Sequence, residues 1–213
     1  MIKYHWIIIL LLQFNFARGQ NIDSAVSSAV KVLHQQRVDS IVTVGLSLMF
    51  HGMEDTLAGI GPVTPFEIRY LIYRKNRTVC SRKFVEYLDT KGEKPIVAVS
   101  RLIESNCDSL YVWMGLNLNE LRNEDIYPYI SKQLINGKEV YTPLIIDHVV
   151  RFDFWFHIHD KWFGKTVNPD DLERVSFMQS ENLNYAYNSH TKLSEFFGLV
   201  TGYIDKFDHK YVF

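Results

Sequence analysis

The chain has 213 residues, of which 47% are hydrophobic and 14% aromatic, and it carries 23 basic and 24 acidic residues. This apolar content is enough for a buried core and excludes a largely disordered chain. A formal charge of −1 provides no excess of cations for nucleic acid or for an anionic membrane surface, so neither partner is expected.

The chain begins with the pattern of a secretory signal peptide. An apolar run over 6–12 comes after a lysine, and Ala17 and Gly19 stand at the −3 and −1 positions of a cleavage site. The run is about half of the roughly 20 residues that span a bilayer, so a retained membrane anchor is the minor alternative. We therefore expect a secreted, extracellular protein with a signal peptide over 1–19 and a single domain over 20–213.

The predicted domain begins with a helix and a strand. Residues 21–36 have apolar side chains at three- and four-residue spacing, which predicts an amphipathic helix that covers a sheet. Residues 41–51 alternate between two sides, which predicts a strand with one buried face. Residues 52–65 contain three glycines and two prolines and are predicted to be a loop, and 66–74 is predicted to be a second strand.

The middle of the chain is predicted to contain a short helix, two strands and a hairpin. The helix spans 82–90, after Ser81 as a capping residue. The strands span 96–102 and 110–118. The hairpin spans 129–146, because its Asn136-Gly137 pair suits a two-residue turn that needs positive φ at both positions.

A further long strand is predicted over 149–159, and its apolar face is expected to form one wall of the core. After it, Asn168-Pro169 is typical of a helix start, and the spacing over 190–207 predicts a last amphipathic helix. The fold class is therefore α+β, with a mostly antiparallel, twisted sheet of six or seven strands, an N-terminal helix and two C-terminal helices packed on it. The residues of the strand's apolar face are Val150, Phe152, Phe154, Phe156 and Ile158.

Two covalent modifications are expected in a secreted chain. Cys80 and Cys107 are the only cysteines and are predicted to form a disulfide, with two free thiols as the alternative. That disulfide would close a 28-residue loop and stabilise the fold by about 3.5 kcal/mol in the chain-entropy model. Asn76 begins the one N-glycosylation sequon, and a glycan there requires a solvent-facing loop, with an unused sequon as the alternative.

His157 and His159 form the sharpest chemical pattern in the sequence. Residues two apart on a strand point to the same side, so both imidazoles are predicted to share the face opposite the phenylalanine stripe. Such a pair could chelate zinc or copper, with Asp153, Asp160 or His148 as a third ligand. No third ligand is specified by the spacing, so a solvent-facing polar stripe is the favoured alternative.

Aromatic residues give the second functional indication. Tyr111, Trp113 and Trp155 fall on the predicted less buried sides of their strands, and exposed aromatic surface on a sheet often marks a binding face. The alternative is that helices cover both faces of the sheet, which would make these rings part of the core.

These observations favour a non-enzymatic extracellular binding protein for a small apolar ligand or a protein partner. The sequence has no nucleophile elbow, phosphate-binding glycine loop or HExxH motif, and nothing in it implies a cofactor or specifies an oligomeric state. Two alternatives stay open. One is a secreted metal-dependent enzyme that uses His157 and His159, and the other is a secreted effector or protease inhibitor that acts through loop 52–65.

Overall fold

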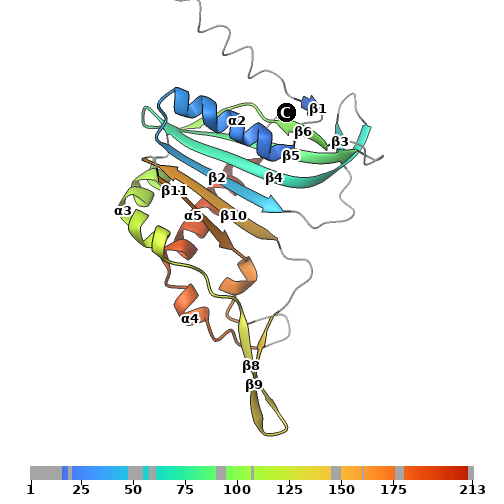
Figure 1. The fold of residues 1–213 in the computed structure, drawn as a ribbon, viewed down its shortest axis with the longest axis vertical. Coiled ribbons are helices and arrows are strands. Elements are labelled where there is room, and N and C mark those ends of the chain that lie inside the picture. Colours follow the sequence, from blue (N-terminus) through green and yellow to red (C-terminus); the bar gives the residue numbers. More distant parts are fainter. Residues whose placement is uncertain are drawn as a thin grey trace, which may run out of the picture.

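The computed structural model describes residues 16–18, 21–47, 55–57, 61–89, 95–106, 108–144, 150–159, 161–175 and 180–210. Their secondary structure is α+β (Figure 1). The elements in chain order are β1 (Phe16–Arg18), α2 (Ile22–Gln35), β2 (Ser40–Ser47), β3 (Asp55–Leu57), β4 (Gly61–Lys75), β5 (Thr78–Asp89), β6 (Pro95–Val99), β7 (Ile103–Ser105), α3 (Ser109–Asn123), β8 (Ile130–Ile135), β9 (Lys138–Pro143), β10 (Arg151–Ile158), β11 (Lys161–Val167), the 3-10 turn η1 (Pro169–Leu172), α4 (Tyr185–Asn188) and α5 (Lys192–Asp208).

One antiparallel sheet organises the molecule. Its main path has seven strands in the order β1-β6-β5-β4-β2-β10-β11, with β3 added to β4 and β7 added to β5. The predicted α+β class is confirmed, with an antiparallel sheet, an N-terminal helix and C-terminal helices. No helix in the described part of the chain is long and apolar enough to cross a membrane.

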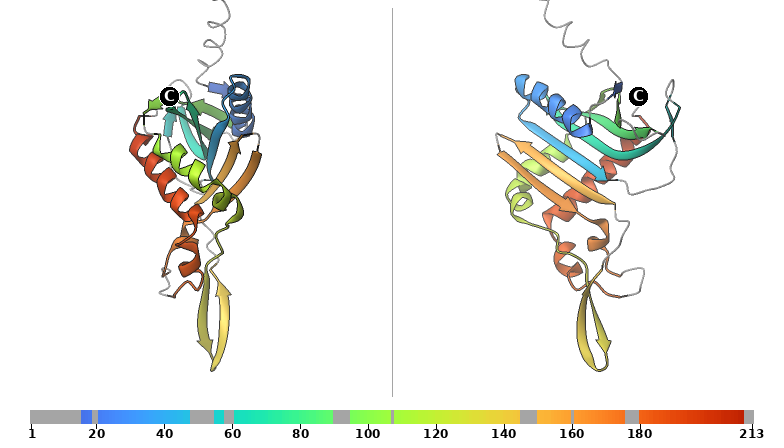
Figure 2. Two further views of the ribbon diagram at one scale, coloured as in Figure 1. Left: turned by 90° about the vertical axis from the view of Figure 1, so that its left-hand side faces the viewer. Right: turned by 45° about the vertical axis from the view of Figure 1, so that its right-hand side comes forward.

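Helices α3 and α5 lie on one face of the sheet, and α2 lies on the other (Figure 2). The larger core lies under α3 and α5. In it, Phe154 and Phe156 of β10 contact Phe196 of α5 at ring-centroid distances of 5.4 and 5.0 Å. The predicted wall is therefore confirmed for the four members of the stripe that lie within β10, which are Phe152, Phe154, Phe156 and Ile158.

Helix α2 is positioned by two contacts at its first turn. The Asn21 side chain accepts a hydrogen bond from the Ser24 amide, as expected of an N-cap. The buried carboxylate of Glu86, on β5, accepts a hydrogen bond of 2.6 Å from the Ile22 amide. The apolar side of the helix then packs on the sheet through Ile22, Val26, Val30 and Leu33, which confirms the predicted helix and its face.

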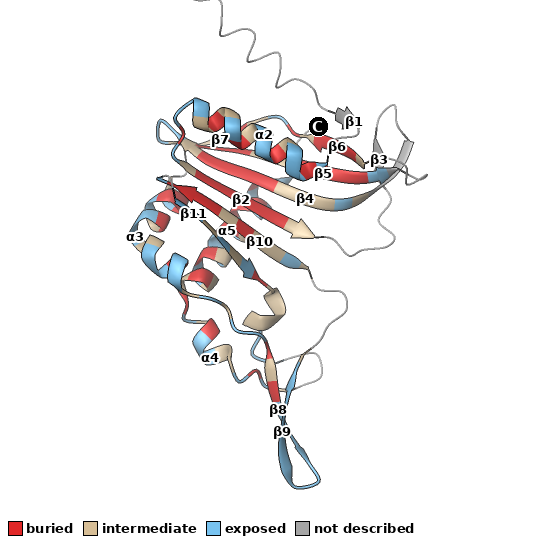
Figure 3. Ribbon diagram, in the orientation of Figure 1, coloured by how far each residue is buried: buried red, intermediate tan, exposed pale blue. Residues whose placement is uncertain are grey.

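The predicted hairpin is also confirmed. Asn136 and Gly137 have φ of 53° and 76°, so they form the turn between β8 and β9 that their sequence indicates. Among the described strands, the two of this hairpin pair only with each other, and the hairpin projects from the body (Figure 1). Most of its surface is exposed (Figure 3), including Leu134 and Tyr141 at 73% and 58%.

Three predictions of local structure were wrong. Residues 82–90, predicted as a helix, lie largely in strand β5, because β4 offers a long ladder of hydrogen bonds along this segment. Residues 110–118, predicted as a strand, lie in helix α3, where the buried Leu110, Met114 and Leu121 share the side that faces α5 and the sheet. The apolar residues of this segment fit both periods, and packing selects the helical one.

The predicted loop over 52–65 also contains strand structure. Residues 55–57 form β3, and β4 already begins at Gly61. The register of the β4–β5 ladder shifts between Pro65 and Glu67, which is how a strand accommodates a proline. Asn168 caps a helical start as predicted, but the element that it caps is the single 3-10 turn η1.

Replacing Phe154 by alanine tests the core assignment. Phe154 is 0% exposed, so Phe154→Ala is expected to lower the free energy of unfolding by about 3–5 kcal/mol, measured by urea denaturation. The matched control is Phe66→Ala, because Phe66 is 50% exposed and its loss should change stability by less than about 0.5 kcal/mol. Equal effects of the two changes would contradict the assignment.

Asp208 should make stability depend on acid pH. Partial burial by itself would raise the pKa of Asp208, but hydrogen bonds from the Lys83 ammonium (2.8 Å) and the Tyr70 hydroxyl (2.9 Å) lower this pKa overall. A carboxyl group with a lowered folded-state pKa contributes stability at neutral pH that is lost as the pH falls through that pKa.

The test compares Asp208→Asn with Asp205→Asn on the same helix, because Asp205 is exposed and has no ion pair among the described residues. Thermal unfolding should show a smaller loss of stability on acidification for Asp208→Asn than for the wild type. Asp205→Asn should follow the wild-type curve. A wild-type pH profile for Asp208→Asn would show that the Lys83 contact contributes nothing to stability.

Candidate ligand groove

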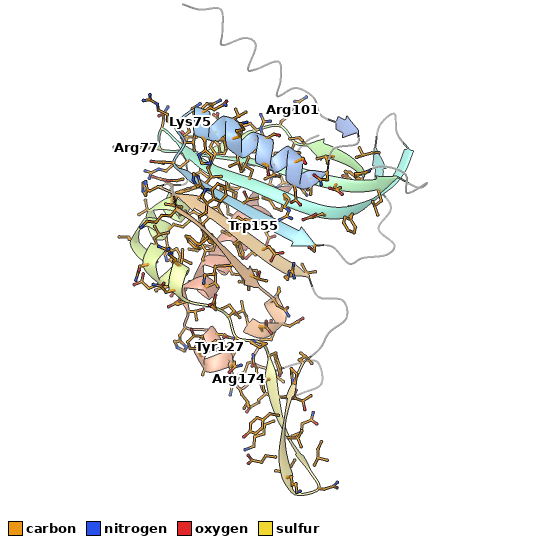
Figure 4. The ribbon with its side chains drawn as sticks, in the orientation of Figure 1. Lys75, Arg77, Arg101, Tyr127, Trp155 and Arg174 are labelled. Atoms are coloured by element: carbon orange, nitrogen blue, oxygen red, sulfur yellow. The ribbon has the colours of Figure 1, made fainter. Side chains whose placement is uncertain are left out.

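Helix α2 leaves part of its face of the sheet uncovered. The cluster beneath α2 draws its members from the helix itself, from β2, β4, β5 and β6, and from the connecting residues Val38 and Leu102. The described residues of β10 and β11 contribute nothing to it. Beyond the helix, the same sheet face continues over β10 and β11 as a floor that carries Trp155 and Trp162 (Figure 4 labels Trp155). The space between α2 and this floor is called the α2 groove here.

The α2 groove has a volume of about 630 Å³. One wall is helix α2, and the floor is formed by β2, β4, β10 and β11. The volume lies in the ordinary range of small-molecule sites, about 300–1,000 Å³. The lining residues are Asp23, Val26, Ser27, Val30, Lys31 and His34 from the helix and Thr43, Arg69, Trp155 and Trp162 from the sheet.

Trp155 forms an aromatic platform on the floor. A Cβ placed on Gly164 would lie 3.8 Å from one end of the indole, and one placed on Gly45 would lie 3.0 Å from the other end. The indole therefore extends between two glycines on the strands that flank β10. Because Gly45 has no side chain, the Trp155 ring and the Arg69 guanidinium have room beside the sheet.

Arg69 stacks on Trp155 and links the floor to the helix. Its guanidinium carbon lies 4.3 Å from the centroid of the Trp155 ring, a cation–π geometry. The same guanidinium pairs with Glu67 and, at 3.2 Å, with Asp23 in the first turn of α2. Burial raises the pKa of Glu67, although Arg69 acts to lower it. Arg69 is 12% exposed in its side chain, so this cation is held inside the groove wall.

An aromatic cluster closes the groove at the end that lies beside the last turn of helix α2. The rings of His34 and His157 meet edge to face at 3.8 Å, and the His157 ring lies 4.3 Å from the Trp162 ring. Trp162 is 59% exposed, whereas His157 is 6% exposed. The cluster thus joins α2 to β10 and β11 and presents one open indole to solvent.

The prediction that His157 and His159 share one sheet face is wrong. His157 is buried under His34, whereas His159 lies in the turn after β10 with φ of 47° and places its ring 3.7 Å from Asp39. The strand ends at Ile158, so the two imidazoles do not share a sheet face as predicted. Asp153 is held by Arg151 and Thr166, and His148 and Asp160 lie outside the described residues. In the part of the chain that is described, no group of three or more metal-ligating side chains occurs.

Two of the three predicted aromatic binding residues lie elsewhere. Tyr111 and Trp113 belong to α3, so they are not on an exposed strand face. Tyr111 is buried in the larger core, which raises the pKa of its hydroxyl, and Trp113 stacks on Phe196. Of the predicted set, only Trp155 lines the α2 groove.

The predicted modifications stay predictions. Cys80 is buried, which raises the pKa of its thiol, but Cys107 lies outside the described residues. Asn76 is exposed in the two-residue turn between β4 and β5, with φ of 51°, so a glycan on its side chain would meet solvent. The cleavage of residues 1–19 and the effector role of loop 52–65 also stay predictions. Part of that loop lies outside the described residues.

Arg69 and His34 were not selected from the sequence. Arg69 is a charged residue in an otherwise apolar strand, and His34 comes directly after the last buried leucine of the first helix. Alternation alone could have placed Arg69 on the same side as Leu71. Its partner Trp155 could not be identified without the order of the strands, because β2 lies between them.

No family model, curated protein or solved structure matches the chain. The groove is therefore interpreted from its own residues.

Gly45→Ala tests whether the bare backbone at this position holds the Arg69–Trp155 stack. A Cβ there would collide with the Arg69 guanidinium, so the change should displace Arg69, alter the Trp155 fluorescence and lower stability by about 0.5–1 kcal/mol. The matched control is Gly164→Ala, whose Cβ would meet its neighbours at ordinary distances of 3.7 Å or more. Identical spectra for both variants and the wild type would contradict the role of Gly45.

Proposed function

We propose that this chain is a secreted, non-enzymatic binding protein that holds a small apolar ligand with a flat, unsaturated portion in the α2 groove. The observation that carries the proposal is the pair of indoles on an uncovered sheet face. Trp155 lies on the floor and Trp162 is 59% exposed at its edge. A large aromatic side chain left open on a concave apolar surface is a frequent mark of a binding site.

Polar groups in the walls would orient such a ligand. Arg69 Nε and His34 Nε2 are buried and have no hydrogen-bond partner among the described residues. Arg69 lies at one end of the groove and His34 at the other, and apolar side chains of α2 stand between them. This arrangement suits an apolar body with one or two polar substituents, because a few polar groups in an apolar pocket fix orientation.

The secreted state is supported by the apolar run and small-residue exit within 1–19. The metal-dependent enzyme is the weaker alternative, because His157 and His159 are separated by the end of β10. An extracellular protein partner is the other alternative. It is favoured by the exposed apolar residues of the β8–β9 hairpin, which lies away from the groove (Figure 1).

Titration with the neutral fluorescent probe N-phenylnaphthylamine tests the groove. We expect saturable binding to the mature protein and a fall in affinity of about tenfold for Trp162→Ala, because an aromatic contact and its buried area are lost. The control is a variant with Leu134→Ser and Tyr141→Ser on the hairpin, which should bind like the wild type. Unchanged affinity in Trp162→Ala, or a loss in the hairpin variant instead, would contradict the proposal.

A further inference from the structure

A second cavity lies at one end of the sheet, apart from the α2 groove. It is lined by the residues that follow α2, by the β4–β5 turn, by the end of β10 and by one side of α3. Its volume is about 530 Å³. Figure 4 shows Lys75 and Arg77 at this end of the molecule, away from Trp155 on the sheet face. This cavity is called the basic pocket here.

The rim of the basic pocket has an excess of positive charge. Arg37, Lys75 and Arg77 line it, and none of the three has a carboxylate within ion-pair distance among the described residues. Arg74, also on the wall, is paired with Asp108 at 2.8 Å. The one carboxylate among the described residues that line the cavity is Asp39, which lies 3.7 Å from His159.

The backbone holds two of these cations, both arginines, in an unusual conformation. Five described residues other than glycine have positive φ, and four of them line this pocket. Arg37, with φ of 60°, stands just after α2, and Arg77, with φ of 66°, stands second in the β4–β5 turn. Glycine is the ordinary residue at both kinds of position. An arginine there is strained, which indicates that its side chain serves a purpose that glycine cannot serve. The four residues are Arg37, Asn76, Arg77 and His159.

The floor of the basic pocket is apolar. Val38, Met114, Leu118 and Ile158 line it beneath the cations. Tyr111 contributes to the wall, and its buried hydroxyl has no hydrogen-bond partner among the described residues. An apolar floor below unpaired cations is complementary to an amphiphile with a negative headgroup.

We propose that the basic pocket binds a small amphiphilic anion, with its carboxylate or phosphate headgroup between Arg37, Lys75 and Arg77 and its apolar chain on the floor. The planar guanidinium groups match both headgroups through paired hydrogen bonds. The site is separate from the α2 groove, so it does not depend on the function proposed for that groove.

Calorimetric titration of the mature protein, after removal of any N-glycan from Asn76 at the rim, tests the proposal. The probes are octanoate, octyl phosphate, octanol and inorganic phosphate. We expect the two amphiphilic anions to bind, and the neutral alcohol and the inorganic ion to bind at least about tenfold more weakly. The stronger of octanoate and octyl phosphate identifies the headgroup. Equal binding of octanol would overturn the assignment of the cations, and equal binding of inorganic phosphate would overturn the assignment of the floor.

The decisive variants are Arg37→Gly and Arg77→Gly. Glycine relieves the strain of positive φ, so each variant should melt at the same temperature as the wild type or higher, while affinity for the anions falls about tenfold or more. The matched control is Arg174→Ala, because Arg174 is exposed and distant from the pocket (Figure 4). Trp162→Ala should leave anion binding unchanged. Retained affinity in both glycine variants, or a loss of affinity only alongside a lower melting temperature, would overturn the proposal.

Discussion

The anchoring and orientation of helix α2 determine which surfaces of this protein are open. The helix runs along β4, because Asp23 in its first turn pairs with Arg69 and Gln36, just after its last residue, accepts a hydrogen bond from Lys75. A helix is about 10 Å wide, whereas the seven strands of the main sheet path span about 29 Å. One helix of this size cannot cover that face. The hydrogen bond from the Ile22 amide to the buried Glu86 carboxylate fixes the start of the helix over β5. The uncovered remainder therefore falls on β10 and β11.

The two faces of β10 have different roles for the same reason. Its phenylalanine stripe packs under α5 and is part of the larger core. Its other face has no helix above it in the described part of the chain, so Trp155 can remain accessible in the groove, and His157 is covered by a ring contact with His34. The strand thus supports stability on one side and supplies a candidate binding surface on the other.

The α2 groove and the basic pocket differ in chemistry because different parts of α2 border them. The groove runs along the body of the helix, where Val26 and Val30 provide apolar surface and Arg69 is already engaged by two carboxylates. The basic pocket begins past the last helical residue, where Arg37 adopts positive φ and has no acidic partner among the described residues. We therefore propose an uncharged apolar ligand for the first and an anionic amphiphile for the second.

The local sequence pattern by itself determined those elements whose residues fit only one type of secondary structure. Alternation in β2 and β10, the spacing and cap of α2, the spacing of α5 and the Asn136-Gly137 turn each depend on neighbouring residues only. Tertiary structure decided the rest. The segment in α3 fits both a strand and a helix, and its packing against α5 selects the helix. The segment in β5 is a strand because β4 supplies its hydrogen-bond partners. The groove brings Arg69 to Trp155 and His34 to His157, and such pairs depend on strand order and helix placement, which arise from contacts between residues distant in the sequence.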